Sequence, residues 1–115
     1  MGLEIEAVPK GTSLFLRLRG DLDMEGARLF REAADEWLDG AGTGKLVVNL
    51  AEVAFVDSTG VGALLGRYRR LRAQRGSMVL VSPKPHVRPV LEMAGIPRLM
   101  PIVEHEAQAQ EVDAR

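Results

Sequence analysis

The chain has 115 residues, of which 46% are hydrophobic and 27% are charged, and it contains no cysteine. A folded chain of this length buries about 65% of the surface that it exposes when unfolded, so a core can form without disulfides or a structural metal. The absence of cysteine excludes zinc-ribbon, iron–sulfur, thiol-nucleophile and disulfide-bonded classes. We expect one domain over residues 1–115, with no cofactor.

Charge and targeting signals narrow the classes further. Fifteen basic and sixteen acidic residues nearly cancel, so the molecule has no overall field that would gather nucleic acid or anionic lipid. The N-terminus lacks the regions of a signal peptide, and Glu6 stands where a myristoylation signal needs Ser or Thr. No apolar run approaches the ~18 residues that cross a bilayer. We expect a cytoplasmic protein that contacts neither nucleic acid nor membrane directly.

The N-terminal third predicts a hairpin followed by a helix. Residues 3–8 and 14–19 alternate between apolar and polar side chains, as paired strands do. Residues 20–23 are predicted to turn the chain, with Asp23 as the N-cap of a helix that reaches about Leu38. The apolar residues of this helix recur at helical spacing and form one stripe: Phe30, Ala33, Ala34, Trp37 and Leu38.

The middle of the chain predicts two buried strands around a second helix. Residues 45–50 and 78–81 are short apolar runs of strand length, typical of strands covered on both faces. Residues 54–56 lead into the polar turn 57–60, and the helix that follows runs to about Arg75, where Gly76 ends it. Its apolar stripe consists of Val61, Leu64, Leu65 and Tyr68.

The C-terminal third predicts a third helix and a last strand. Gly95 can take the left-handed position that ends the helix. The helix either begins near Pro89, or begins at Pro85 and is kinked by Pro89. Residues 100–103 are a candidate strand, and residues 104–115 are a terminal helix or a tail. Alternating strands and helices predict an α/β domain with a mostly parallel central sheet, an N-terminal hairpin and helices packed against the sheet.

The densest functional signal is the strand-to-helix turn at residues 56–62. Three known motifs fail there at a named residue. A nucleophile elbow needs glycine at Val56, a dinucleotide fingerprint needs glycine at Leu65, and a phosphate-binding loop needs a lysine that the segment lacks. Helix capping alone would need only one polar side chain. Gly60 and Gly62 weaken the helix by about 1 kcal/mol each, which favours close approach of another surface.

This turn and its surroundings resemble the STAS family, and within it the bacterial anti-sigma factor antagonists of the sporulation type. The resemblance covers nearly the whole chain. It is carried by Gly20-Asp21-Leu22-Asp23, Val48-Asn49-Leu50, Phe55-Val56-Asp57-Ser58-Thr59-Gly60-Val61-Gly62, Leu65-Gly66-Arg67-Tyr68 and Met93-Ala94-Gly95-Ile96. The family often has Glu at the position of Asp21 and Ser at the position of Thr59. Thr59 keeps a hydroxyl, so it is a second candidate for modification beside Ser58.

The resemblance implies a protein that switches partners and is not an enzyme. The serine matching Ser58 would be phosphorylated by a partner that is both an anti-sigma factor and an ATP-dependent serine kinase. The unphosphorylated form would bind that partner and free the sigma factor, and a separate phosphatase of the PP2C type would reset the switch. The residues implied to contact the partner are Asp23, Asp57, Thr59, Gly60, Val61 and Gly62.

Two other functions compete with this interpretation. Within the same fold, the chain could be an accessory subunit of a stressosome or of a lipid or anion transporter. Outside it, the turn could belong to a small nucleotide-binding protein. The complete Asp57-Ser58-Thr59-Gly60 turn favours the antagonist.

Three other groups of residues predict structure rather than chemistry. His86 and His105 have no metal-binding spacing and are expected to be exposed. All five aromatic residues are expected in or near the core. The basic cluster in and after the second helix is interpreted as a solvated face near the helix C-terminus, with an acidic protein surface as its alternative partner. It consists of Arg67, Arg69, Arg70, Arg72 and Arg75.

Overall fold

The computed structural model describes residues 2–41 and 44–112 and contains one five-stranded sheet. The sheet order is β1-β2-β3-β4-β5, in which β1 is antiparallel to β2 and the other pairs are parallel. The strands are β1 (Glu4–Lys10), β2 (Ser13–Leu22), β3 (Lys45–Val56), β4 (Ser77–Val81) and β5 (Ile102–Val103). The predicted α/β class, with its N-terminal hairpin and mostly parallel sheet, is confirmed.

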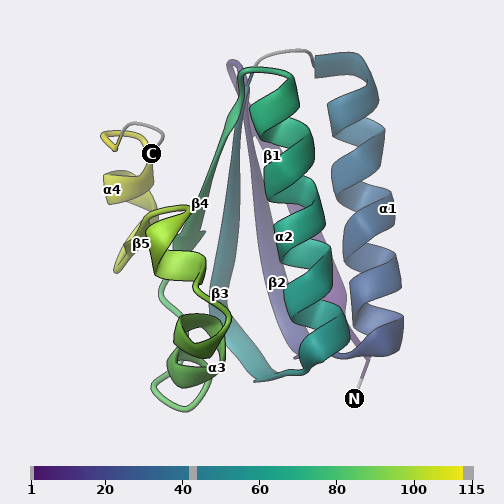
Figure 1. The fold of residues 1–115 in the computed structure, drawn as a ribbon. Coiled ribbons are helices and arrows are strands. Elements are labelled where there is room, and N and C mark those ends of the chain that lie inside the picture. The colour runs from purple at the N-terminus through teal and green to yellow at the C-terminus, as the bar shows by residue number, and fades with distance from the viewer. Residues whose placement is uncertain (1, 42–43, 113–115) are drawn as a thin grey trace.

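Two long helices lie side by side over one face of the sheet (Figure 1). They are α1 (Met24–Ala41) and α2 (Ser58–Ala73). Shorter helical segments follow: α3 (Arg88–Met93), the 3-10 turn η1 (Ile96–Arg98) and α4 (Glu106–Ala109). Each parallel connection advances the chain by one strand, and right-handed crossovers of this kind place successive helices on the same face. The second face of the sheet is therefore left to α4.

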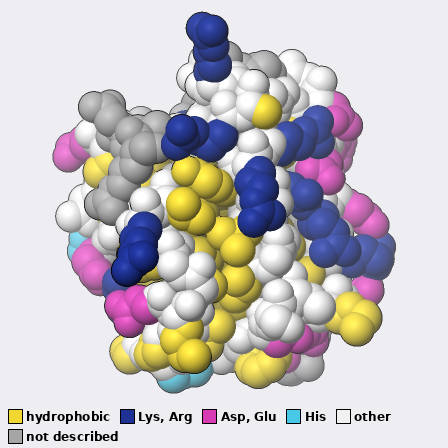
Figure 2. All heavy atoms as spheres, in the orientation of Figure 1, with side chains coloured by type: hydrophobic (Ala, Val, Ile, Leu, Met, Phe, Trp, Pro, Cys, Tyr) yellow, Lys and Arg dark blue, Asp and Glu magenta, His cyan; other side chains and the backbone are white. Residues whose placement is uncertain are grey.

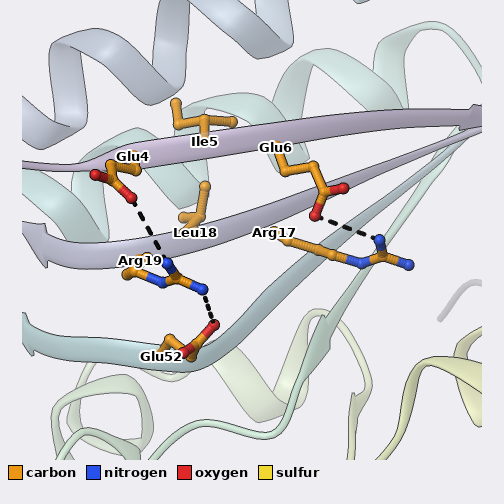
Figure 3. A pocket seen from close by; sticks show the side chains of 7 residues that line it. All are labelled: Glu4, Ile5, Glu6, Arg17, Leu18, Arg19 and Glu52. Atoms are coloured by element: carbon orange, nitrogen blue, oxygen red, sulfur yellow. Dashed lines mark hydrogen bonds and ion pairs between the residues drawn. The ribbon is translucent and has the colours of Figure 1, made fainter.

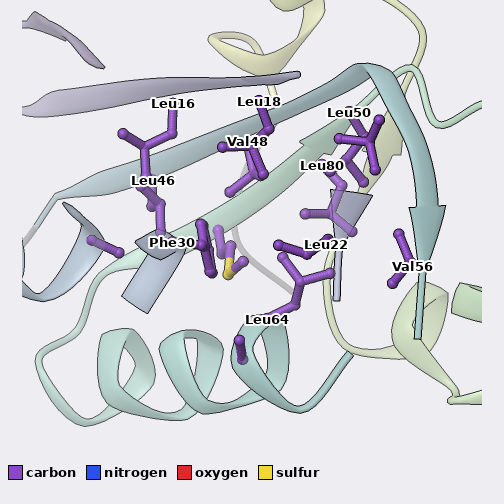
Figure 4. Close-up of a cluster of buried hydrophobic side chains, with 14 of the residues drawn as sticks. Leu16, Leu18, Leu22, Phe30, Leu46, Val48, Leu50, Val56, Leu64 and Leu80 are labelled. Carbon is purple, nitrogen blue, oxygen red and sulfur yellow. The ribbon is translucent and has the colours of Figure 1, made fainter. Parts of the chain in front are cut away.

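Side-chain alternation along the strands builds the core (Figure 4). Leu16 and Leu18 of β2 and Val48 of β3 point toward the helices and are at most 2% exposed. Phe30 of α1 and Leu64 of α2, both predicted stripe residues, meet them there fully buried. The intervening strand residues face the other way and form a smaller apolar cluster with Ala109 of α4: Phe15, Val47, Val79 and Val81.

The predicted turn at residues 20–23 is wrong, because β2 continues through it to Leu22. The strand stays paired with β3 to the end, with register irregularities between Arg17 and Arg19 and between Gly20 and Asp21. Gly20 has a φ of 115°, and a Cβ there would lie 2.1 Å from the carbonyl oxygen of Gly2. The neighbouring strand, which local sequence cannot reveal, keeps this glycine-containing segment extended.

The structure settles one helix start that the sequence left open and changes one expected helix end. The structure favours the later start of α3, at Arg88 with Pro89 in the first turn, over the start at Pro85. The second helix ends at Ala73, and Arg75, rather than Gly76, takes the left-handed conformation with a φ of 62°. Gly76 is instead required by close packing, since a Cβ there would lie 2.6 Å from the Gly44 carbonyl oxygen. Gly95 has a φ of 76°, as predicted.

The segment predicted as a terminal helix or tail contains the short helix α4, which a partly buried ion pair attaches to the sheet. Glu106 accepts hydrogen bonds from Arg17 Nε at 2.8 Å, Arg17 Nη2 at 2.9 Å and Asn49 Nδ2 at 2.8 Å. These bonds lower the pKa of Glu106, with the Arg17 bond as the largest cause. Lys45 Nζ donates to the carbonyls of Ala109 and Val112, both at 2.8 Å. Residues 113–115 lie outside the described part of the chain.

Replacing Glu106 by Gln should destabilise the fold in a pH-dependent way. A hydrogen bond to a charged group contributes about 1.5–3 kcal/mol, and partial exposure of Arg17 reduces this, so we expect a loss of about 1 kcal/mol at pH 7. Because folding lowers the pKa of Glu106, the contribution is complete above its ordinary value of 4.5 and disappears as the pH falls through the lower native value.

Urea denaturation of wild type and Glu106→Gln at pH 7 and pH 3.5 measures this difference. The gap in unfolding free energy between the two proteins should narrow at the lower pH. Glu36→Gln, an exposed site on α1, serves as the matched control and should show little loss at either pH. A gap that stays constant with pH would show that the charge of Glu106 does not hold α4.

Candidate functional site

The polar turn between β3 and α2 is organised by Asp57. Its backbone is extended, with φ −109° and ψ −172°, and its side chain caps the helix. Asp57 Oδ1 accepts hydrogen bonds from the backbone nitrogens of Thr59 at 2.9 Å and Gly60 at 3.0 Å, and from Thr59 Oγ1 at 2.6 Å. The Thr59 hydroxyl bond is the largest cause of a lowered pKa of Asp57. The carboxylate is therefore a fixed negative charge at the positive end of the α2 dipole.

The two hydroxyls of this turn have different surroundings. The Thr59 hydroxyl is engaged with Asp57, whereas Ser58 is exposed at the first position of α2. The side-chain hydrogen bonds found over residues 2–41 and 44–112 do not include the Ser58 hydroxyl. Ser58 Oγ is thus the hydroxyl of the turn that an external group can reach without first breaking a capping bond.

The glycines of the turn have separate roles. A Cβ at Gly60 would lie 2.1 Å from the carbonyl oxygen of Leu22, so the close approach expected there comes from the end of β2, within the chain. A Cβ at Gly62 would meet nothing within 4 Å. Gly62 is exposed, and Val61 beside it is only 9% exposed.

Parallel pairing brings the second predicted acidic residue to the same edge of the sheet. Leu22 pairs with Val56, so Asp23 and Asp57, which follow them, leave adjacent strands together. Asp23 is half-buried and caps α1, accepting from the Gly26 nitrogen at 2.9 Å, as predicted. Two capping carboxylates therefore flank the N-termini of α1 and α2.

Three large apolar side chains are exposed near these caps, and the sequence patterns did not single them out. They are Met24 at 72%, Phe55 at 50% and Met93 at 89% exposure. The expectation that all five aromatic residues lie in or near the core is wrong for Phe55, because its side chain faces solvent while Val53 and Val56 of the same strand are buried in the core. Met24 follows Asp23 directly, and Phe55 lies two residues before Asp57.

Met93 belongs to an apolar groove between α2 and α3. The groove is lined by Asp57, Ser58, Val61, Val90, Met93 and Ala94. Ser58 therefore lies at the edge of a mostly apolar surface, where a partner side chain would be removed from water. The signal available in the sequence was Met93-Ala94-Gly95, which the family resemblance included without giving it a role.

The basic cluster divides into two groups. Arg69, Arg72 and Arg75 are exposed, as expected for a solvated face. That interpretation is wrong for Arg67 and Arg70, which pair across the helix interface with carboxylates of α1.

The geometry of the two pairs differs. Arg70 bonds Asp35 at 3.2 Å and also Asp39. Arg67 Nε lies 3.2 Å from Asp35 but without hydrogen-bonding geometry, and burial lowers the pKa of Arg67. These two arginines join α1 to α2.

The remaining sequence expectations concern metals and membranes. His86 and His105 are exposed, as predicted, and His86 Nε2 lies 2.6 Å from the Ala54 carbonyl oxygen. Within residues 2–41 and 44–112 no three His, Asp or Glu side chains are grouped so as to hold a metal ion. In the same part of the chain, every helix is too short or too polar to span a bilayer.

A second hollow lies on the sheet face away from α1 and α2 and is occupied by paired charges (Figure 3). Arg19 lies 3.8 Å from Glu4 and 3.1 Å from Glu52, and Arg17 lies 3.4 Å from Glu6. Since these charges already satisfy one another, the hollow presents no unpaired group to a ligand. The groove beside Ser58 is the candidate site.

Comparisons of the sequence and of the structure with known proteins point to the same family. The STAS domain model matches residues 4–109. An anti-sigma F factor antagonist from Paenibacillus polymyxa is 33% identical over 109 residues, covering 95% of this chain and 93% of that protein. The structure of the anti-sigma factor antagonist SpoIIAA in its unphosphorylated form superposes with a TM-score of 0.81 at 29% identity, covering 94% of both chains.

The structure of the Bacillus cell fate determinant SpoIIAA in its phosphorylated form is also similar. It superposes with a TM-score of 0.74 at 29% identity and covers 95% of this chain and 96% of that one. With a family model that spans the sheet and all of its helices, the chain belongs to the STAS domain family.

Proposed function

We propose that this protein is an anti-sigma factor antagonist that binds an anti-sigma factor through the surface around Ser58. The observation that carries the proposal is the exposed Ser58 hydroxyl at the N-terminus of α2, beside an apolar groove and near three exposed apolar side chains. Similarity to the antagonist from Paenibacillus polymyxa and to SpoIIAA supports the same role.

Phosphorylation of Ser58 is the proposed switch. A phosphate adds about −1.5 to −2 charge at pH 7 and would lie at the positive end of the α2 dipole, a placement worth about 0.3–1 kcal/mol. The fold should therefore tolerate the modification. Release of a partner by a factor of 100 requires a cost of about 2.8 kcal/mol in the complex. Burial of a poorly paired dianion against Val61, Val90 and Met93 can supply that cost.

The other residues of the site would position Ser58 and contact the partner. Asp57 and Thr59 hold the first turn of α2, and Gly60 lets that turn pack against Leu22. Asp23, Val61 and Gly62 lie around it as proposed contact residues. Met24, Phe55 and Met93 extend this surface with apolar area, which a partner can bury.

The proposed cycle needs two enzymes that are separate from this chain. The anti-sigma factor would itself be the ATP-bound serine kinase, and a phosphatase of the PP2C type would remove the phosphate. The chain would act only by occupying its partner, in the cytoplasm where sigma factors work, and would catalyse no reaction.

Binding should depend on the state of Ser58. Isothermal titration with the purified anti-sigma factor of the source organism should give equal affinity for wild type and Ser58→Ala before phosphorylation. After incubation with ATP and the kinase, wild type should bind about 100-fold more weakly, while Ser58→Ala is unchanged. Ser58→Glu, a weaker charge, should fall between them. Equal binding by all forms would contradict the switch.

The modification should be confined to Ser58 and should leave the fold intact. Mass spectrometry of the peptide containing residues 57–60 should place the phosphate on Ser58, because the Thr59 hydroxyl is held by Asp57. Far-UV circular dichroism should show the same helix content before and after phosphorylation. Phosphate on Thr59, or loss of helix signal, would argue against a switch that acts at the interface.

The exposed apolar side chains should contribute to binding but not to stability. Phe55→Ser and Met93→Ser should each weaken binding about tenfold, a loss of about 1.4 kcal/mol, with little change in Tm. Ala107→Ser, an exposed site on α4, is the matched control and should bind like wild type. If both Phe55→Ser and Met93→Ser bind with wild-type affinity, these two side chains do not contact the partner.

A further inference from the structure

Two glycines in α2 are not required by packing within the chain. Gly62 and Gly66 lie in the helix interior, and a Cβ at either position would meet nothing within 4 Å. Glycine is a poor helix former, second only to proline. At Gly26 and Gly60, by contrast, a Cβ would lie 2.1 Å from a backbone oxygen. Packing therefore explains Gly26 and Gly60 but not the other two.

These two glycines share one face of α2 with Ser58. Positions 58, 62, 66 and 69 follow one another at intervals of four, four and three, which places them in a single stripe along the helix. Ser58 begins the stripe and Arg69 ends it, about three turns away. Between them the helix presents bare backbone.

An apolar strip runs beside this face. Val61, Leu65 and Tyr68 of α2 are buried or half-buried on the side toward α3 and η1, where Val90 and Leu99 also pack against the core. In Figure 2 hydrophobic side chains form a continuous strip between α2 and the α3–η1 segment, with Lys and Arg side chains along its upper border. The strip continues the groove that contains Ser58.

The two ends of this surface differ in charge. Asp57 and Ser58 form the lower end, next to the exposed Met93. At the upper end, toward the C-terminus of α2, Arg69 and Arg72 are exposed. A ligand that fits along the whole surface must therefore be apolar at the Ser58 end and acidic at the Arg69 end.

We propose that an amphipathic helix of the anti-sigma factor lies lengthwise along α2, over Gly62 and Gly66, with an acidic residue at Arg69. This inference rests on the proposed function and identifies the part of the partner that the site receives. Bare backbone allows the axis of the partner helix to come closer than side chains would permit. A phosphate on Ser58 would meet the apolar end of that helix, which explains how one modification at the lower end releases the whole segment.

The test separates stability from binding. Gly62→Ala and Gly66→Ala should each raise Tm by about 2–4 °C, because alanine favours the helix and meets no neighbour. The same variants should bind the purified anti-sigma factor about tenfold more weakly, and Gly66→Leu about 100-fold more weakly. Arg69→Glu should weaken binding at least tenfold at low salt, and the difference from wild type should shrink at high salt, because salt screens both the lost attraction and the new repulsion.

Gly40→Ala is the matched control. Gly40 is a helical glycine of α1, and a Cβ at this position would meet nothing within 4 Å. Its replacement should therefore not lower Tm and should leave binding unchanged.

Three outcomes would overturn the inference. A lower Tm for Gly62→Ala and Gly66→Ala would show that the fold needs these glycines. Wild-type affinity in Gly66→Leu would show that no partner lies on this face, even if binding still depends on Ser58. Failure of wild-type protein to bind the anti-sigma factor at all would overturn the proposed function and this inference together.

Discussion

The parallel pairing of β2 with β3, maintained as far as Leu22 and Val56, determines where every part of the candidate site lies. Because the two strands end together, Asp23 and Asp57 leave the sheet side by side and start α1 and α2 at the same edge. The Leu22 carbonyl also comes within contact of Gly60, so the first turn of α2 packs directly on the end of β2. A register shift of one residue would separate these groups and turn the core side chains outward.

Capping and packing leave one hydroxyl unused at that edge. Asp57 takes up the backbone donors and the Thr59 hydroxyl, and its charge is balanced by the helix dipole. Ser58, one residue away, receives none of these bonds. A modification of Ser58 can therefore change the outer surface while the capping bonds beneath it remain in place.

Charge elsewhere in the molecule serves mainly to join its elements. Arg17 and Glu106 attach α4 to the sheet, and Arg70 with Asp35 and Asp39 joins the two long helices. With these groups paired inside the molecule, the exposed arginines at the upper end of α2 and the apolar residues near Ser58 remain as features that face outward. The near-neutral composition thus conceals a surface with distinct apolar and basic regions.

The sequence by itself determined the α/β class, the N-terminal hairpin, the cap at Asp23 and a polar turn at residues 57–60 before α2, because alternation and capping are local signals. Ser58 as the candidate switch came from the family resemblance. The sequence could not show that β2 runs through residues 20–22, that Phe55 is exposed, or that Gly60 serves packing while Gly62 and Gly66 do not. Those properties depend on which strand or helix lies alongside. A neighbouring strand overrides a turn preference. Only in the assembled sheet and helices does Gly60 pack against Leu22 while Gly62 and Gly66 have no neighbour at the Cβ position.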